Sequence, residues 1–203
     1  MGAKTYKVVD LFSGAGGISL GFERPEELNG LANLGYSDLG FEGDPFETVL
    51  AVEQDDKTAE TFRREFDAEV IEGDIRDIDS FADYDNADIV VGGPPCQGFS
   101  NLNSVKTEEL EDERNRLWRQ YMRAVEEIDP DVFLIENVTR FLKSQEGART
   151  VQIAEDLGYD TVVDTLVTPT ETTTFVNPRI DATATHGSGC TLSSAVAARL
   201  ARG

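Results

Sequence analysis

A cysteine in a stiff loop is the residue of this chain best suited to covalent chemistry. Cys96 lies in the segment GGPPCQGFS, residues 92–100, directly after an apolar run at residues 87–91 that predicts a buried strand. It therefore follows a strand's carboxyl end, where open α/β sheets bind ligands. Two prolines before it fix the backbone, because each ring locks φ and restricts the preceding residue. The pattern fits a reactive thiol, and it also fits a small buried cysteine in a tight loop.

A glycine-rich turn near the start of the chain predicts a ligand site. Residues 6–12 read as a first strand, followed by SGAGG at residues 13–17 and a helix with apolar residues at 18 and 22. The glycines do not match G-x-G-x-x-G, so a dinucleotide site is not indicated. They do allow close backbone approach, and the helix start offers N–H groups to a carboxylate, which suits S-adenosylmethionine. The alternative is a turn that only packs the helix on the strand.

Acidic residues follow the next two expected strands at matching positions. Glu53 ends the strand at residues 48–53, where a ribose hydroxyl pair would be bound, and Gln54 follows it. Asp74 follows the third strand and could accept a hydrogen bond from the exocyclic amine of adenine, with Ile75 against the ring. Taken singly, such acids are more often solvated or cap a helix. Their matching positions favour one shared crevice.

A further acid ends the fifth expected strand. Glu136 follows residues 131–135, and its carboxylate can converge with Cys96 at the end of the fourth strand. Residues 101–113 form a polar, acidic loop of the kind that moves over a site, although a plain solvated loop fits equally. Residues 115–128 predict an amphipathic helix.

Strand and helix patterns alternate along the chain, which predicts an α/β fold with a doubly wound, mostly parallel sheet. Residues 24–46 look like an inserted loop with one short helix. The expected strands are residues 6–12, 48–53, 68–71, 87–91, 131–135 and 161–167. The expected helices are residues 18–23, 26–34, 56–66, 115–128 and 141–157.

The composition indicates a globular, strongly acidic protein. Hydrophobic residues make up 39% of the chain, which is enough for a core, and 39 acidic against 18 basic residues give a net charge of −21. A polyanionic partner would normally require a basic face, and the basic residues form few clusters. Dispersed acid is typical of proteins adapted to high salt, although an acidic face for a partner would give the same composition.

Other functional classes find little support. The two cysteines, Cys96 and Cys190, predict neither a disulfide framework nor a zinc site. His186 fits a polar loop residue better than a metal ligand. No apolar run has the length of a membrane span, and no signal-peptide pattern is present, so we expect a cytoplasmic protein without metal.

Taken in order, these motifs resemble those of the DNA cytosine-5 methyltransferases over about residues 5–166. The matching segments are DLFSGAGG at 10–17, Glu53, GDI at 73–75, GPPCQGFS at 93–100, DERNRL at 112–117 and ENV at 136–138. The resemblance implies the Rossmann-like fold of S-adenosylmethionine-dependent methyltransferases.

The resemblance also implies a reaction and a set of residues. The Cys96 thiolate would attack C6 of a flipped cytosine in DNA, so that C5 can accept the methyl group of S-adenosylmethionine, while Glu136 holds or protonates N3. Cofactor-binding residues would be Phe12, Ser13, Gly14, Gly16, Gly17, Glu53, Gln54, Asp74, Ile75 and Pro94. Substrate-binding residues would be Pro95, Gln97, Ser100, Asn137 and Val138.

The carboxy-terminal residues depart from the family pattern. We expect a methyltransferase core at residues 1–168 without the later basic motif, target-recognition region or last cofactor motif. Residues 178–198 instead resemble the anion-hole segment of phosphomethylpyrimidine kinases of the ribokinase-like superfamily, with Cys190 at the catalytic position. Residues 169–203 would then be a foreign tail rather than an independent domain.

Three functions remain open on the sequence. The first is a cytosine-5 methyltransferase with impaired activity, which could require a second chain for target recognition. The second is an inactive remnant that binds S-adenosylmethionine. The third is a phosphomethylpyrimidine kinase fragment, which the absence of its nucleotide pocket disfavours.

Overall fold

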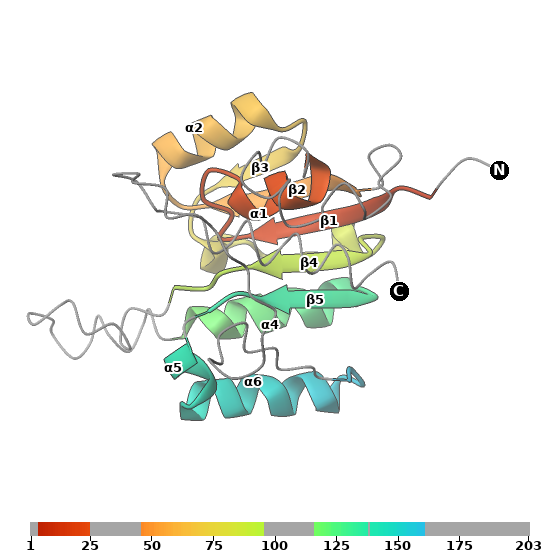
Figure 1. Ribbon diagram of the computed structural model, residues 1–203, viewed down its shortest axis with the longest axis vertical. Helices are drawn as coiled ribbons and strands as arrows, with labels where there is room; N and C mark the ends of the chain where they lie inside the picture. Colours follow the sequence, from red (N-terminus) through yellow and green to blue (C-terminus); the bar gives the residue numbers. More distant parts are fainter. Residues whose placement is uncertain (1–3, 25–45, 96–115, 138, 161–203) are drawn as a thin grey trace, which may run out of the picture.

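The computed structural model describes residues 4–24, 46–95, 116–137 and 139–160, and these form an α/β fold around one parallel sheet (Figure 1). The strand order is β3-β2-β1-β4-β5, and every pairing between neighbours is parallel. The carboxyl ends of all five strands therefore meet at one edge of the sheet. The strands are β1 (Tyr6–Leu11), β2 (Phe46–Glu53), β3 (Glu69–Glu72), β4 (Ile89–Gly92) and β5 (Val132–Ile135).

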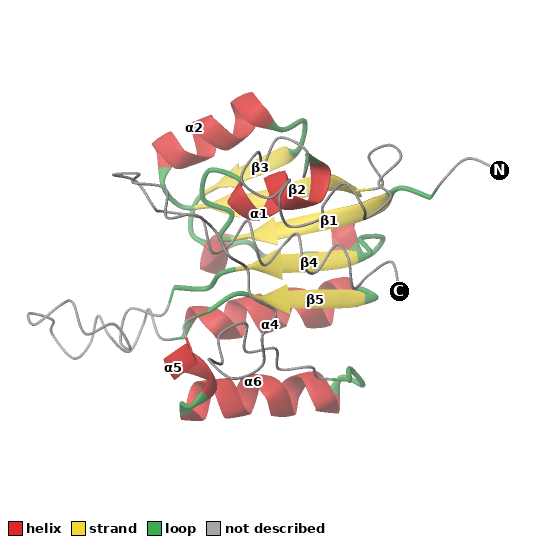
Figure 2. Cartoon of the chain, viewed as in Figure 1, coloured by secondary structure: helices red, strands yellow, loops and turns green. Residues whose placement is uncertain are grey.

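Helices flank the sheet, as Figure 2 shows, so the doubly wound prediction is confirmed. The five α-helices described are α1 (Gly17–Glu23), α2 (Asp56–Glu65), α4 (Leu117–Ile128), α5 (Thr139–Leu142) and α6 (Gln145–Asp156). Two 3₁₀ turns that the sequence did not predict, η4 (Ile75–Asp77) and η5 (Ala82–Tyr84), lie between β3 and β4.

Alternating side chains of the strands build a core on each face of the sheet. Val8 of β1 packs with Ile18 and Phe22 of α1, whereas its neighbour Val9 belongs to the larger cluster that includes Tyr121 of α4. This period of two is the ordinary geometry of a strand buried on both faces. The sheet is therefore a rigid platform for groups at its carboxyl edge.

The predicted helix at residues 141–157 is wrong in one respect, because it is divided into α5 and α6. The Ser144 hydroxyl accepts a hydrogen bond from the Gly147 N–H at 3.1 Å and caps α6. Gly147 also packs so closely on α5 that a Cβ there would lie 2.2 Å from the Phe141 carbonyl oxygen. The predicted helix at 26–34, loop at 101–113 and strand at 161–167 lie outside the described residues.

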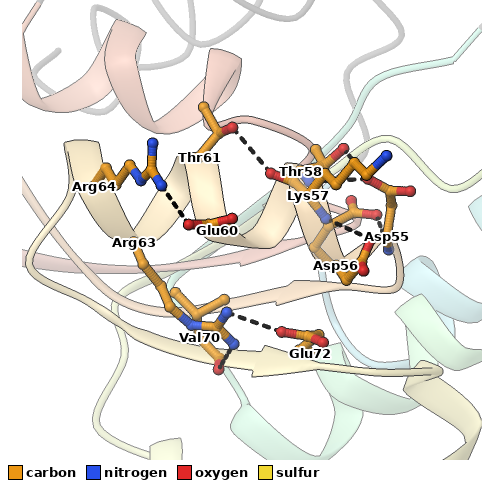
Figure 3. A network of polar contacts seen from close by, with 11 residues as sticks. Asp55, Asp56, Lys57, Thr58, Glu60, Thr61, Arg63, Arg64, Val70 and Glu72 are labelled. Atoms are coloured by element: carbon orange, nitrogen blue, oxygen red, sulfur yellow. Dashed lines mark hydrogen bonds and ion pairs between the residues drawn. The ribbon is translucent and has the colours of Figure 1, made fainter.

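Helix α2 is fixed at both ends by polar contacts (Figure 3). Its cap is Asp55, and the Asp55 carboxylate accepts from the Thr58 N–H at 2.9 Å. Arg63 forms an ion pair with Glu72 at 2.9 Å and donates to the Val70 carbonyl, which ties the helix to β3. The last turn of α2 is thereby held against β3.

The lengths of the described helices bear on whether any of them could cross a membrane. None of the described helices is long and apolar enough to span a bilayer.

Candidate functional site

A cavity of about 230 Å³ opens at the carboxyl edge of the sheet. This volume is below the roughly 300–1,000 Å³ of pockets that enclose a whole drug-sized ligand, so the cavity would enclose only part of one. Five of the predicted cofactor-binding residues line it: Phe12, Glu53, Gln54, Asp74 and Ile75. The other lining residues are Val52, Gly73, Gly93, Leu117 and Pro95, the last of which is predicted to contact the substrate base.

The turn after β1 has an unusual backbone. Phe12 has φ 58° and Gly16 has φ 95°, both in the left-handed region that a phenylalanine rarely occupies. The Ser13 N–H donates to the Val52 carbonyl at 3.1 Å, which turns the chain toward β2. A Cβ at Gly16 would lie 2.2 Å from the ring of Phe66, so glycine is required there. The predicted residues Ser13, Gly14, Gly16 and Gly17 shape this turn, and Phe12 faces the cavity from it.

Glu53 joins the glycine turn to the start of α2. One carboxylate oxygen accepts from the Gly14 N–H at 2.8 Å, and the other accepts from the Asp55 N–H at 2.8 Å. Each carboxylate oxygen can accept about two hydrogen bonds, so both retain capacity toward the cavity. A pair of ribose hydroxyls is the kind of donor that this arrangement suits.

Asp74 makes contacts that the sequence did not indicate. Its carboxylate accepts from the Arg76 backbone N–H at 2.9 Å and pairs with the Arg76 guanidinium at 2.6 Å. The hydrogen bond from the Arg76 side chain lowers the pKa of Asp74, so the carboxylate is charged at neutral pH. Asp74 also lines the cavity beside Ile75. The predicted interaction with an adenine amine would have to share an acceptor already bound by Arg76.

A buried carboxyl lies beneath the turn. Asp10 of β1 is fully buried and accepts from the Ser19 hydroxyl at 2.7 Å, while its Oδ1 has no hydrogen-bond partner among the described residues. Burial raises the pKa of Asp10 to about 7. The folded protein therefore binds this proton more tightly than the unfolded chain does. The one sign of this in the sequence is an acid within an apolar strand.

We expect Asp10→Asn to remove a pH dependence of stability. A raised folded-state pKa stabilises the fold at low pH, and this stabilisation is lost as the pH rises through about 7. Between pH 5 and 8.5, wild type should lose about 3 kcal/mol of unfolding free energy relative to the variant. Urea unfolding of both proteins at the two pH values measures the difference. A difference in unfolding free energy between wild type and Asp10→Asn that does not change with pH would contradict the raised pKa of Asp10.

The ends of β4 and β5 are held side by side. The Glu136 N–H donates to the Gly92 carbonyl at 3.0 Å, and the Asn137 side-chain amide donates to the Pro94 carbonyl at 3.1 Å. A Cβ placed on Gly93 would lie 3.1 Å from Glu136 Oε2, so the carboxylate lies over this glycine. Gly93 also lines the cavity, which brings Glu136 to its border.

Tyr121 supports this junction from within the core. Its side chain is fully buried, and its hydroxyl lies 3.0 Å from the Val90 carbonyl oxygen and 2.9 Å from that of Leu134. The hydroxyl thus bridges β4 and β5 two or fewer residues before each strand ends. Helical periodicity predicts that Tyr121 is buried, but it does not reveal these two acceptors.

Four predicted site residues cannot be placed. Cys96, Gln97, Ser100 and Val138 lie outside the described residues, so the approach of the Cys96 thiol to Glu136 stays a prediction. Within the described ranges, no group of three or more His, Cys, Asp or Glu side chains is arranged to hold a metal ion.

Comparison with known proteins assigns the chain to a family. The model of the C-5 cytosine-specific DNA methylases matches residues 6–167. Type II methyltransferase M1.HphI of Haemophilus parahaemolyticus is 32% identical over 160 residues, which cover 74% of this chain and 38% of that protein. Type II methyltransferase M.AquIA of Picosynechococcus is 35% identical over 149 residues, covering 70% of this chain and 52% of that protein.

A solved structure agrees at the level of the fold. A Spodoptera frugiperda DNMT2 mutant superposes with a TM-score of 0.52 at 19% identity, over 75% of this chain and 41% of that protein. The chain spans about two fifths of the length of M1.HphI and of M.FnuDI of Fusobacterium nucleatum. Because the family model matches residues 6–167, this chain belongs to the C-5 cytosine-specific DNA methylases.

Proposed function

We propose that the chain forms the cofactor-binding and catalytic core of an enzyme that transfers a methyl group to C5 of cytosine in DNA. One observation carries the proposal beyond the family match. Gly93 lines the cavity, and a Cβ built on Gly93 would lie 3.1 Å from Glu136 Oε2, just after the end of β5. A ligand in the cavity and a base beside Glu136 would therefore be neighbours.

The residues around the cavity fit S-adenosylmethionine, which would supply the methyl group. Glu53 presents two carboxylate oxygens to hydroxyl donors, and the apolar side chains of Phe12, Ile75 and Leu117 provide contact for an adenine ring. The adenine amine would share Asp74 with Arg76. Pro94 is fixed beside this region by the Asn137 amide.

The catalytic roles follow from the positions of the two strand ends. Cys96 follows β4 by four residues and would act as the nucleophile toward C6 of the base. Glu136 would hydrogen-bond N3 and stabilise the charge that develops on the ring. Because β4 and β5 end at the carboxyl edge of the sheet, the cytosine would have to leave the duplex to reach groups that follow them. Pro95, Gln97, Ser100, Asn137 and Val138 would surround the flipped base.

A second chain belongs to this proposal. The family match ends at residue 167, inside the chain, and we propose that a separate polypeptide supplies target recognition. Residues 1–168 would then be the methyltransferase core, and residues 169–203 a tail that resembles the kinase anion-hole segment. We also propose a cytoplasmic location, because the proposed substrate is DNA. The acidic composition, with a net charge of −21, supports function at high salt.

The alternative is a remnant that binds S-adenosylmethionine without catalysis. The net charge of −21 favours it, since a polyanionic partner such as DNA would normally require a basic face. Cofactor binding without methyl transfer, with and without a supplied recognition chain, would support this alternative.

Methyl transfer tests the proposal directly. Labelled S-adenosylmethionine is incubated with DNA and the full chain, alone and with the recognition half of a type II relative, at low and high salt. We expect incorporation that Cys96→Ser reduces to background and Glu136→Gln reduces about 100-fold or more. Glu60→Gln, on the exposed face of α2, is the matched control and should retain activity. Absence of incorporation under every condition would contradict the enzymatic proposal.

A further inference from the structure

An arginine and a glutamate one turn apart on α4 bind the backbone of the segment that follows β3. Arg123 and Glu127 occupy positions i and i+4 and approach each other at 3.6 Å. The segment at residues 75–81 comprises η4 and the backbone that connects η4 to η5. It begins at the cavity with Ile75. Arg123 donates to carbonyl groups between Ile75 and Asp79, and Glu127 accepts from donors at Ser80 and Phe81.

Arg123 binds carbonyl groups. Its Nη2 donates to the carbonyl oxygens of Ile78 at 3.0 Å and Ile75 at 3.2 Å, and its guanidinium lies 5.2 Å from the centre of the Phe81 ring. A guanidinium is a planar, permanently charged donor, so it can hold several acceptors in one fixed geometry. One of these acceptors is the carbonyl oxygen of Ile75, which lines the cavity.

Glu127 binds the donors at the other end of the same segment. Its Oε2 accepts from the Phe81 N–H at 2.6 Å and from the Ser80 hydroxyl at 3.2 Å. The Arg123 cation therefore binds carbonyl oxygens of the segment, and the Glu127 anion binds its N–H and O–H donors. Hydrogen bonds to charged groups are the stronger class, so the segment has little freedom to shift relative to α4.

The same helix reaches the cavity through Leu117, while Ile75 is 3% exposed and faces the cavity from the segment. We propose that Arg123 and Glu127 are positioning residues that set the distance between Ile75 and Leu117, and so the slot that receives the adenine ring. This inference rests on the proposed function, because it assumes that the cavity binds an adenosine group. A purely structural role would fix α4 to the core without affecting ligand affinity.

Calorimetric titration of the full chain separates these roles. Arg123→Met keeps an unbranched apolar stem and removes the guanidinium; S-adenosylmethionine and adenosine are titrated at a temperature at which circular dichroism shows the variant folded. We expect the Kd to rise about tenfold for both ligands, since the slot is no longer preorganised. Arg123→Lys, which keeps a cation with fewer donors, should restore part of the affinity. Arg119→Met, on the exposed side of α4 beside Trp118, is the matched control and should bind as wild type does.

The outcomes distinguish this inference from the proposed function. If folded wild type binds neither ligand, the proposed function fails and the inference fails with it. If wild type binds and folded Arg123→Met binds both ligands equally well, the inference alone is overturned. A loss of affinity for S-adenosylmethionine without a loss for adenosine overturns it as well. Should Arg123→Met not fold, Glu127→Ala serves instead, with an expected rise in Kd of about fivefold, and an unchanged Kd overturns the inference.

Discussion

Glu53→Ala should weaken binding of S-adenosylmethionine by about 100-fold or more. A hydrogen bond to a charged group is worth about 1.5–3 kcal/mol, and two such bonds to ribose hydroxyls would be lost together. The variant also releases the N–H groups of Gly14 and Asp55, which the carboxylate now holds at 2.8 Å each. The glycine turn and the start of α2 would therefore lose their common anchor. Calorimetric titration measures the change in Kd.

Glu72→Ala is the matched control for Glu53. The two glutamates are paired across the β2–β3 ladder, but Glu72 forms its ion pair with Arg63 and is exposed. An exposed pair contributes little, so the Glu72 variant should bind the cofactor as wild type does. Equal affinities of the two alanine variants would contradict the role given to Glu53.

Gly92→Ala should cause a large loss of stability, of about 3 kcal/mol or more. A Cβ at this position would lie 2.2 Å from the Leu11 carbonyl oxygen and 3.1 Å from the Tyr121 ring. Neither neighbour can move readily, because one belongs to the β1 backbone and the other is fully buried. Urea unfolding, followed by circular dichroism, measures the effect. An unfolding free energy within about 1 kcal/mol of wild type would contradict the close approach of β1 and β4.

Gly93→Ala is the informative comparison, because the neighbouring glycine meets a different obstacle. The new Cβ would lie 3.1 Å from Glu136 Oε2, the end of a side chain that can rotate. The stability cost should therefore be small, while the displaced carboxylate should lower methyl transfer at least tenfold. A small stability cost with unchanged transfer would show that Glu136 does not act from this position.

Much of the sheet and of the cavity wall is predictable from the sequence, because both depend on local patterns. Apolar, β-branched runs mark β1, β4 and β5, and glycine or acidic residues mark their ends. Glu53 and Asp74 are predicted from their places at the ends of successive strands, and Phe12 from the family resemblance of its segment; all three line one cavity. Parallel strands share an edge, so sequence position at each strand end translates directly into proximity.

The contacts that hold the site together are less predictable, because they join side chains to distant backbone groups. Arg123 contacts carbonyls at Ile75 and Ile78, and the Tyr121 hydroxyl contacts two strands; neither partner can be identified from periodicity. The division of the last helix at Ser144 was missed for a related reason. A serine within an amphipathic pattern acts as a cap only when the chain before it turns.

Titration of the full 203-residue chain with S-adenosylmethionine is the most direct test of the central claim, that the carboxyl edge of β1, β2 and β3 binds this cofactor. Calorimetry at low and at high salt should show saturable binding to one site per chain, and Glu53→Ala should weaken it strongly while Glu72→Ala leaves it intact. A folded wild-type chain that releases or absorbs no binding heat under either condition, and whose melting temperature the cofactor does not raise, would contradict it.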